Sequence, residues 1–188
     1  MRKRSATVAL TLMGAAFVLS GCKEDQTEAA SFPDLASCRA QADQGSLAFT
    51  AEDCEAAFAQ AQADHQETAP RYDALAVCEE QHGAGNCEQQ AQQGGGFSFM
   101  PLLAGMMIGQ MLSGGRGFMS QPLVNTANGR YATPGGAQVA SNSGRGAMNT
   151  AAFNKAPTTA GRPPMTQADV MRRGGFGASG AARSSFGG

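Results

Sequence analysis

Four cysteines, placed in two similar segments, restrict the fold of this chain more than any other feature. Residues 32–38 and residues 72–78 each contain an aromatic residue, a Leu three positions later and a Cys three positions after that. Each segment is followed by a second Cys that directly precedes a Glu. An even number of cysteines in an exported chain indicates two disulfides, and four cysteines allow three pairings. The repeat favours the local pairing, Cys38–Cys54 and Cys78–Cys87.

The cysteine segments also predict helices, because residues at i, i+3 and i+6 lie on roughly one side of a short helix. A longer helix is predicted to begin near Thr50, a residue type that caps helices, and to reach about Thr68, before Pro70 ends it. Residues 31–92 are therefore expected to form a small α-helical, disulfide-stapled module with an acidic surface. The apolar stripe of the longer helix consists of Cys54, Ala57, Phe58 and Ala61.

The chain has few large side chains with which to build a core: it contains 25 Gly, 8 Pro, no Trp and only 6% aromatic residues. Such a chain cannot bury enough apolar area to offset the entropy lost if all of it were ordered. The disulfides matter for this reason, because closing a loop of about 15 residues contributes up to roughly 3 kcal/mol. The composition therefore predicts one small folded module rather than a fully ordered chain.

The net charge of −1 conceals two halves of opposite sign. Residues 23–93 carry 14 acidic and 3 basic side chains, a net charge of −11, whereas residues 94–188 carry 8 basic and 1 acidic side chain, a net charge of +7. An acidic folded part with a basic interaction tail fits this division. Two solvated surfaces, or a tail that folds back on the acidic part, fit it as well.

The N-terminus has the features of an export signal. Basic residues at positions 2–4 precede an apolar stretch over residues 6–19. This stretch is too short to span roughly 30 Å of hydrocarbon comfortably, but it has the length of a signal-peptide core. The tetrapeptide that ends at Cys22, Leu-Ser-Gly-Cys, resembles the bacterial lipobox. An uncleaved anchor helix and a buried core helix are the alternatives.

Cleavage at this motif defines residues 1–21 as a signal peptide and residues 22–30 as a linker whose Cys22 carries the lipid. Several acyl chains hold a protein stably on a membrane, since each buried methylene contributes about 0.8 kcal/mol. Lys23 stands where the familiar signal for retention in the inner membrane is Asp. We therefore expect a lipid anchor in a bacterial cell membrane, and the lipobox resemblance implies the outer membrane, facing the periplasm.

Residues 97–112 are apolar except at Ser98 and Gln110, and we expect them to form a short helix rich in Gly and Met. Pro101 suits the first turn of such a helix, and the GxxxG pair that begins at Gly105 lets a partner helix approach closely. The residues expected to contact a membrane or a partner are Leu102, Leu103, Gly105, Met106, Met107 and Gly109.

The role of this apolar segment stays open between four interpretations. The segment packs on the module or on a second copy, enters the membrane beside the lipid anchor, binds Cu(I), or has no stable structure. Thioethers suit Cu(I), but Met is also a common core residue. The methionines in question are Met100, Met106, Met107 and Met111.

Residues 113–188 contain mainly Gly, Ser, Ala, Asn, Pro and Arg, without a lasting hydrophobic period, so we expect a disordered basic tail. Residues 172–177 resemble an RGG element, which would indicate RNA binding in the cytoplasm. Export argues against nucleic acid. An anionic envelope polymer or lipid head groups are better partners for a basic tail outside the cytoplasm.

The sequence shows no set of residues with the pattern of a catalytic or metal site. Cys78, His82 and Cys87, with His65 nearby, offer zinc two thiolates and an imidazole, but the spacing is loose and an oxidising compartment disfavours thiolates. We expect both histidines to be plain exposed residues. No nucleophile–base pair or carboxylate pair stands out, so neither an enzyme, a metal nor a cofactor is expected.

Several motifs occur in a fixed order along nearly the whole chain. They are the lipobox at Cys22, Cys54-Glu55, Thr68-Ala69-Pro70-Arg71-Tyr72, Cys78, Gly85-Asn86-Cys87, Met100-Pro101-Leu102, Gly105-Met106-Met107-Ile108-Gly109, Gln121-Pro122-Leu123 and Arg173-Gly174-Gly175-Phe176-Gly177. In these motifs the chain resembles the YgiB-like family of uncharacterised bacterial lipoproteins, a domain-of-unknown-function family. The resemblance implies a Gram-negative envelope location, and it carries over no catalytic residue.

These features predict a non-enzymatic cell-envelope lipoprotein that binds or organises another envelope component. Its expected partners are the membrane, through the N-terminal lipid, and an envelope protein or an anionic envelope polymer. One alternative is an accessory or adaptor subunit that docks on an envelope enzyme or transporter through residues 97–112. Another is a periplasmic metal-handling protein that uses the methionines or His82.

Overall fold

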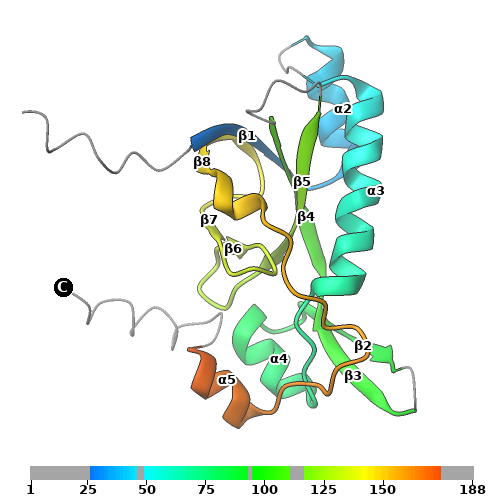
Figure 1. Cartoon of the computed structure of the whole chain (residues 1–188), viewed down its shortest axis with the longest axis vertical. Coiled ribbons are helices and arrows are strands. Elements are labelled where there is room, and N and C mark those ends of the chain that lie inside the picture. Colours follow the sequence, from blue (N-terminus) through cyan, green and yellow to red (C-terminus); the bar gives the residue numbers. More distant parts are fainter. Residues whose placement is uncertain (1–25, 46–48, 93–94, 111–116, 175–188) are drawn as a thin grey trace, which may run out of the picture.

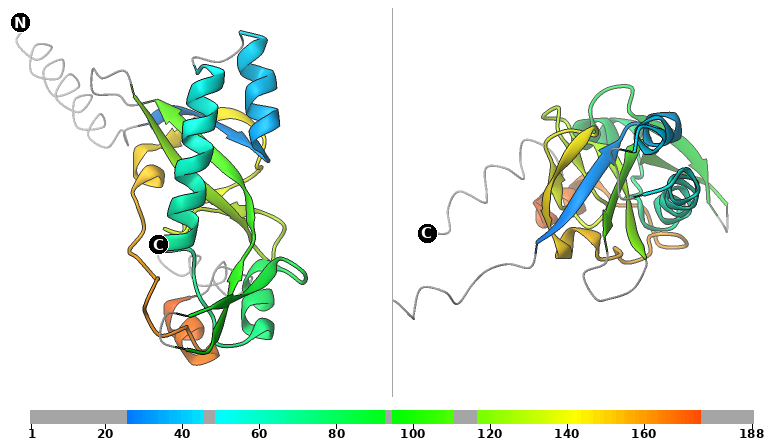
Figure 2. Two further views of the ribbon diagram at one scale, coloured as in Figure 1. Left: turned by 90° about the vertical axis from the view of Figure 1, so that its right-hand side faces the viewer. Right: turned by 90° about the horizontal axis from the view of Figure 1, so that it is seen from above.

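The computed structural model describes residues 26–45, 49–92, 95–110 and 117–174, which form a mixed α/β fold (Figure 1). A curled antiparallel sheet has the strand order β7-β6-β5-β4-β1-β8, and a second sheet pairs β2 with β3 (Figure 2). The elements are β1 (Gln26–Phe32), α2 (Leu35–Asp43), α3 (Ala51–Thr68), α4 (Leu75–His82), β2 (Cys87–Ala91), β3 (Phe97–Pro101), β4 (Leu103–Gln110), β5 (Phe118–Asn125), β6 (Tyr131–Ala132), β7 (Gln138–Val139), β8 (Gly144–Asn149), the 3-10 helix η2 (Thr150–Phe153) and α5 (Gln167–Arg173). The predicted signal peptide, the predicted lipidation site Cys22 and residues 175–188 lie outside the described residues.

The helices predicted from the cysteine segments are present as α2 and α4, and the longer predicted helix is α3. A capping box starts α3: Asp53 N donates to Thr50 Oγ1 at 3.2 Å, and Thr50 N donates to Asp53 Oδ2 at 2.9 Å. This reciprocal pair satisfies two backbone donors that a helix start leaves free. Helix α3 ends at Thr68, two residues before Pro70, as the fixed φ and missing N–H of proline predict.

The predicted fold class, a small α-helical module followed by an apolar helix and a disordered tail, is wrong. The first error is the apolar segment, which forms strands β3 and β4 instead of a helix. Along β4, Met106 and Ile108 pack into the cluster that includes α2 and α3, whereas Met107 packs on the opposite face of the sheet. A strand buried on both faces is apolar throughout, so its sequence has no period that separates it from a buried helix.

Two glycines of β4 are required by close contacts within the sheet. Gly105 has φ +143°, and a Cβ there would lie 2.5 Å from the backbone oxygen of Phe32 in β1. At Gly109, a Cβ would lie 2.5 Å from Cζ of Phe153, whose ring fills the space above the strand. The GxxxG pair therefore admits a neighbouring strand and an aromatic ring, and not a partner helix.

The second error is the tail: the part of residues 113–188 that the structure describes is ordered into β5 to β8, η2 and α5. Its large apolar side chains are few but well buried, and Leu123, Val124 and Phe153 are all less than a tenth exposed. Pro122 is tolerated inside β5 because β6 pairs only with Val124 and Asn125, which leaves β5 as an edge strand at the proline. Short strands added to an existing sheet thus need little hydrophobic sequence of their own.

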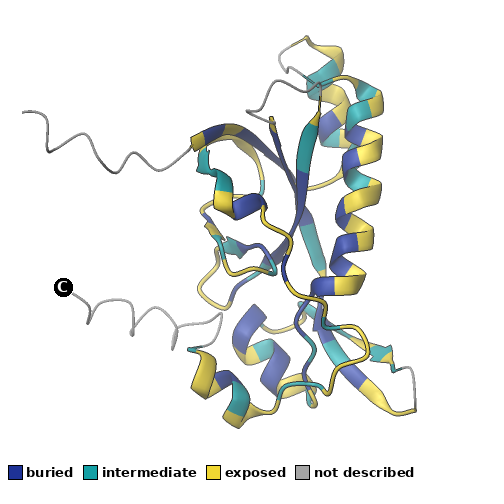
Figure 3. Cartoon of the chain, in the orientation of Figure 1, coloured by how far each residue is buried: buried dark blue, intermediate teal, exposed yellow. Residues whose placement is uncertain are grey.

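The sheet carries a layer on each face. Helices α2 and α3 cover one face, with their solvent side exposed and their inner side buried (Figure 3). Ser120 of β5 ties the layers together by donating to the Ala57 carbonyl of α3 at 2.8 Å. On the other face, Phe153 of η2 lies against the sheet, and Gln121 of β5 donates to its carbonyl at 2.9 Å.

Beyond one end of the large sheet, α4, α5 and the β2–β3 hairpin pack together (Figure 1). Tyr72 lies between two segments there, bridged to Phe99 of β3 on one side and to Met165 on the other. Residues 154–166, the connecting segment, run from η2 to α5 and bind the end of α3. Within it, Lys155 Nζ lies 2.9 Å from Asp64 and 2.7 Å from Glu67, so the basic half of the chain does fold back on the acidic half.

Candidate functional site

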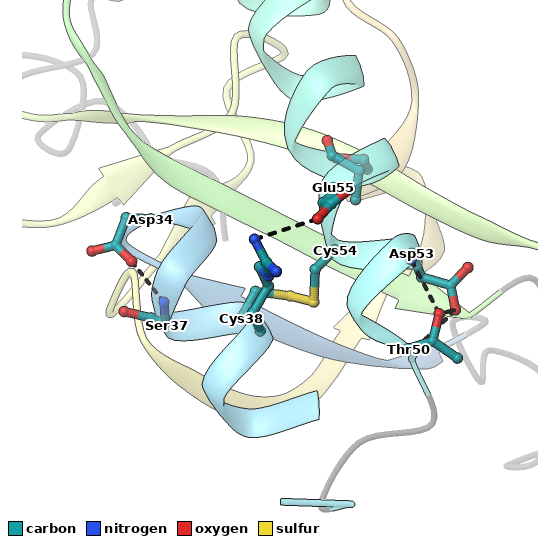
Figure 4. The surroundings of a disulfide bond; sticks show 10 residues. Asp34, Ser37, Cys38, Thr50, Asp53, Cys54 and Glu55 are labelled. Carbon is teal, nitrogen blue, oxygen red and sulfur yellow. Dashed lines mark hydrogen bonds and ion pairs between the residues drawn. A yellow bond between two sulfur atoms is a disulfide. The ribbon is translucent and has the colours of Figure 1, made fainter. Parts of the chain in front are cut away.

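The two disulfides have the pairing that the internal repeat favours. Cys38–Cys54 joins α2 to α3, with an Arg39–Glu55 ion pair beside it (Figure 4), and Cys78–Cys87 joins α4 to β2. Each of these four cysteines is therefore held in one of two disulfides. The zinc set considered from the sequence loses both of its thiolates, because Cys78 and Cys87 are bonded together.

A buried polar chain lies where α4 meets the large sheet. His82 Nδ1 is 2.7 Å from the Asn125 carbonyl oxygen, and His82 Nε2 is 2.8 Å from the hydroxyl of Tyr72. A carbonyl oxygen can only accept, so Nδ1 carries the proton of the neutral ring and Nε2 accepts from the Tyr72 hydroxyl. Both side chains are fully buried. Burial lowers the pKa of His82 to about 4 and raises the pKa of Tyr72.

The prediction that both histidines are exposed is wrong. His65 is 3% exposed and its Nε2 donates to the Pro101 carbonyl at 2.9 Å, which joins α3 to the end of β3. Desolvation lowers the pKa of His65, as it does for His82. Both rings therefore serve as neutral links between distant elements, a role that residue type alone does not reveal.

A pocket of about 440 Å³ lies beside this buried chain. Its walls come from the end of α3 and the residues after it, from the turn between β6 and β7, from the connecting segment and from α5. Tyr72 forms part of the wall, and Pro70, Pro134, Pro157 and Pro163 supply rigid apolar surface. Three arginines line the pocket, and no Asp or Glu is among the described residues that line it. We call this site the arginine pocket; its arginines are Arg71, Arg162 and Arg173.

Arg71 is the most firmly held of the three arginines. Its Nη2 donates to the Gln66 carbonyl oxygen at 2.8 Å, one of the carbonyls that the last turn of α3 leaves free. Its Nε is buried and has no hydrogen-bond partner among the described residues. Arg162 and Arg173 are exposed, and Arg173 Nη1 lies 3.2 Å from Met165 Sδ. The site thus combines one ordered guanidinium with two cations at its rim.

The six residues predicted to contact a membrane or partner are mostly inside the protein. Gly105, Met106, Met107 and Gly109 are buried in the sheet, whereas Leu103 is half-buried and Leu102 is 37% exposed. The two leucines line a second hollow of about 570 Å³, together with Gln62, His65, Gln66 and Glu88. Among helices in the described ranges, none combines the length and the apolar character needed to cross a bilayer.

The methionines weighed as a copper set do not gather at one place. Met106 and Met107 lie on opposite faces of β4, and Met111 is outside the described residues. Within the part of the chain that the structure describes, no three His, Cys, Asp or Glu side chains come together in a way that could hold a metal ion.

The arginine pocket was missed from the sequence, because its three cations come from segments far apart in the chain. Arg71 was noted within a family motif, and Arg173 within a family motif and the RGG-like element. Arg162 is part of no motif. The usable signal is the position of Arg71 and Arg162 beside prolines, in Pro70-Arg71 and Arg162-Pro163, where the backbone is restricted.

Comparison with known proteins places the chain in a family. The model of a family described as "Protein of unknown function (DUF1190)" matches residues 26–187. A UPF0441 protein of Pectobacterium carotovorum subsp. carotovorum (strain PC1) is 32% identical over 196 residues, which cover 97% of this chain and 84% of that protein. No solved structure matches the chain. The resemblance to an uncharacterised bacterial family is confirmed, and the chain belongs to the DUF1190 family of proteins of unknown function.

Proposed function

We propose that this chain is a lipid-anchored, non-enzymatic protein of the bacterial cell envelope that binds an anionic envelope component in the arginine pocket. The observation that carries the proposal is the composition of that pocket, three arginines without a carboxylate on its described walls. Unopposed cations in a hollow attract anions and raise their local concentration. Carboxylates and phosphates are abundant in bacterial envelope polymers and lipids.

The cysteines support the location. Four of the five cysteines of the chain form two disulfides, which persist in oxidising compartments such as the periplasm and are rare in the cytosol. The fifth, Cys22, ends the lipobox-like sequence and stands four residues before the start of β1. With three residues between them, the Cα atoms of Cys22 and Gln26 can lie roughly 14 Å apart at most. Lipid on Cys22 would therefore keep the folded body close to the bilayer.

The buried chemistry supports a binding role over a catalytic one. Tyr72 lines the pocket, but its hydroxyl is bonded to His82 Nε2, and the other ring nitrogen of His82 is bonded to the Asn125 carbonyl. Both are fully buried, so neither presents a free proton donor or acceptor to a ligand. A catalytic base must come within hydrogen-bond reach of the proton that it removes.

The anchor is tested by Cys22→Ser. We expect this variant to keep residues 1–21 and to lose labelling by a radioactive or clickable fatty acid, with loss of the membrane-bound fraction. Cys38→Ser is the matched control, because its cysteine lies in the folded body and its change should leave acylation intact. Normal processing and acylation of Cys22→Ser would show that the anchor is elsewhere.

The binding role is tested with the mature chain, purified in detergent, against peptidoglycan sacculi and vesicles that contain phosphatidylglycerol. The double variant Arg71→Gln/Arg162→Gln should lose binding to at least one of them. The double variant Arg39→Gln/Arg130→Gln removes the same charge from exposed positions outside the pocket. This control variant should still bind as the parent chain does. Equal losses in both variants would mean that net charge, and not the pocket, controls binding.

A further inference from the structure

We infer that the arginine pocket holds one compact oxyanion, a phosphate or a carboxylate, against the guanidinium of Arg71. The inference deepens the proposed function and rests on it, since it names the chemical group that the pocket takes and the residue that reads its shape. Three features support it: the fixed guanidinium of Arg71, the size of the pocket and the distribution of charge around it.

The first feature is the fixed guanidinium of Arg71. Nη2 has two N–H groups, of which the Gln66 carbonyl takes one, and this bond fixes the plane of the group. Nε is buried, so a ligand would use the remaining N–H groups of Nη1 and Nη2. A planar pair of oxygens matches the parallel N–H groups of an arginine fork, so a carboxylate or phosphate is the group that Arg71 suits best.

The second feature is the size of the pocket. A cavity of about 440 Å³ has the volume of a small-molecule site, which typically spans roughly 300–1,000 Å³. Four separate stretches of chain surround it, and the β6–β7 turn faces it through Pro134, Gly135 and Gly136. A single charged group with a short attached body fits such an enclosure. Such a group can be free, can end a polymer or can be the head of a lipid.

The third feature is charge. Arg162 and Arg173 add two exposed cations at the rim, no carboxylate is among the described residues that line the pocket, and Asp64 and Glu67 of α3 are paired with Lys155. An anion in the pocket therefore meets positive charge without competition from its walls. We assign Arg71 the geometric role and the two rim arginines a supporting electrostatic one, because exposed charges are screened by salt within about 8–10 Å.

The probes are methyl phosphate and acetate, titrated into the mature full chain in detergent and followed by isothermal calorimetry and by NMR of the arginine Nε signals. At least one probe should bind, and Arg71→Lys should weaken it about tenfold, because lysine keeps the charge but loses the fork. Arg130→Lys, at an exposed turn outside the pocket, is the matched control and should bind as the parent does. Circular dichroism confirms that each variant is folded.

Should Arg71→Lys not fold, Arg162→Gln provides the second test, since this side chain is exposed and its loss should weaken binding by a few-fold in low salt only. Competition identifies the source of the group. Displacement of phosphatidylglycerol vesicles by methyl phosphate indicates a lipid head group, and displacement of sacculi by acetate indicates a wall carboxylate.

Equal affinity of the parent chain and Arg71→Lys would overturn the inference. The inference also fails if neither small probe binds although the double variant Arg71→Gln/Arg162→Gln no longer binds sacculi or vesicles. That result leaves the proposed function standing. If that double variant keeps its full binding to sacculi and vesicles, the proposed function itself fails. The two ideas can therefore fail separately.

Discussion

Single residues determine how closely the layers of this protein approach, and glycine is the clearest case. At Gly105 the backbone adopts a positive φ and the oxygen of Phe32 occupies the place of a side chain. The sequence shows that two glycines are spaced four apart, but it does not show what lies against them. The neighbours come from β1 and η2, which are distant in the chain, so the helix-pairing interpretation of the motif had the right spacing and the wrong partners.

Replacing Gly105 by Ala tests this contact. The added Cβ meets backbone that cannot move without shifting β1, and the positive φ strains any side chain, so we expect the free energy of unfolding to fall by about 2 kcal/mol or more. Gly146→Ala in β8 is the control, because no atom lies within 4 Å of its Cβ position. Urea denaturation checks both, and a Gly105→Ala variant as stable as the control would refute the close approach.

The buried state of His82 predicts how stability depends on pH. The unfolded chain takes up a proton on this ring near pH 6.5, whereas the folded chain does so only near pH 4, because burial disfavours the charged form. The unfolded state thus binds more protons in this window. The free energy of unfolding should fall by about 3 kcal/mol as the pH drops from about 6.5 to about 4.

The measurement is a series of urea denaturation curves between pH 7 and pH 4. His82→Gln lacks the titrating ring, so its stability should be lower at pH 7 but should change less over the same range. Some slope remains in this variant, because burial also lowers the pKa of His65. Parallel curves for the two proteins would show that His82 is not responsible.

At the scale of elements, the sequence predicts helices α2, α3 and α4 but misses helix α5 and the strands. Helices α2, α3 and α4 are marked by local features, such as the Thr50 cap and the regular spacing of aromatic, Leu and Cys. Strands β3 and β4 lie in one apolar run, where no alternation is visible because both faces are covered. Strands β6 and β7 have two residues each, and they join the sheet only by pairing with β5 and with each other.

The Cys38–Cys54 bond should stabilise the α2–α3 pair strongly. It closes a loop with a sequence separation of 16, for which the loss of loop entropy in the unfolded chain corresponds to about 3 kcal/mol. We expect the double variant Cys38→Ala/Cys54→Ala to lose about that much free energy of unfolding. Arg39→Ala, which breaks a half-exposed ion pair beside the bond, should cost less than about 1 kcal/mol. Similar losses of stability in the two variants would show that the disulfide stabilises the α2–α3 pair no more than the ion pair does.

At the scale of the whole molecule, the two halves of opposite charge form one structure. Strand β1 pairs with β8, so Gln26 lies opposite Asn149, and Lys155 reaches back to α3. Contacts between residues so far apart leave no local pattern, which explains why the composition suggested a disordered tail. The same long-range pairing assembles the arginine pocket from four stretches of chain.

The most direct test of the central claim, a disulfide-bonded body held on a membrane by lipid at Cys22, is the intact mass of the protein purified from bacterial membranes. The account predicts a chain that starts at Cys22, carries acyl groups there, and gains four hydrogens on reduction as its two disulfides open. A chain that retains residues 1–21, lacks acyl mass and has five free thiols would contradict it.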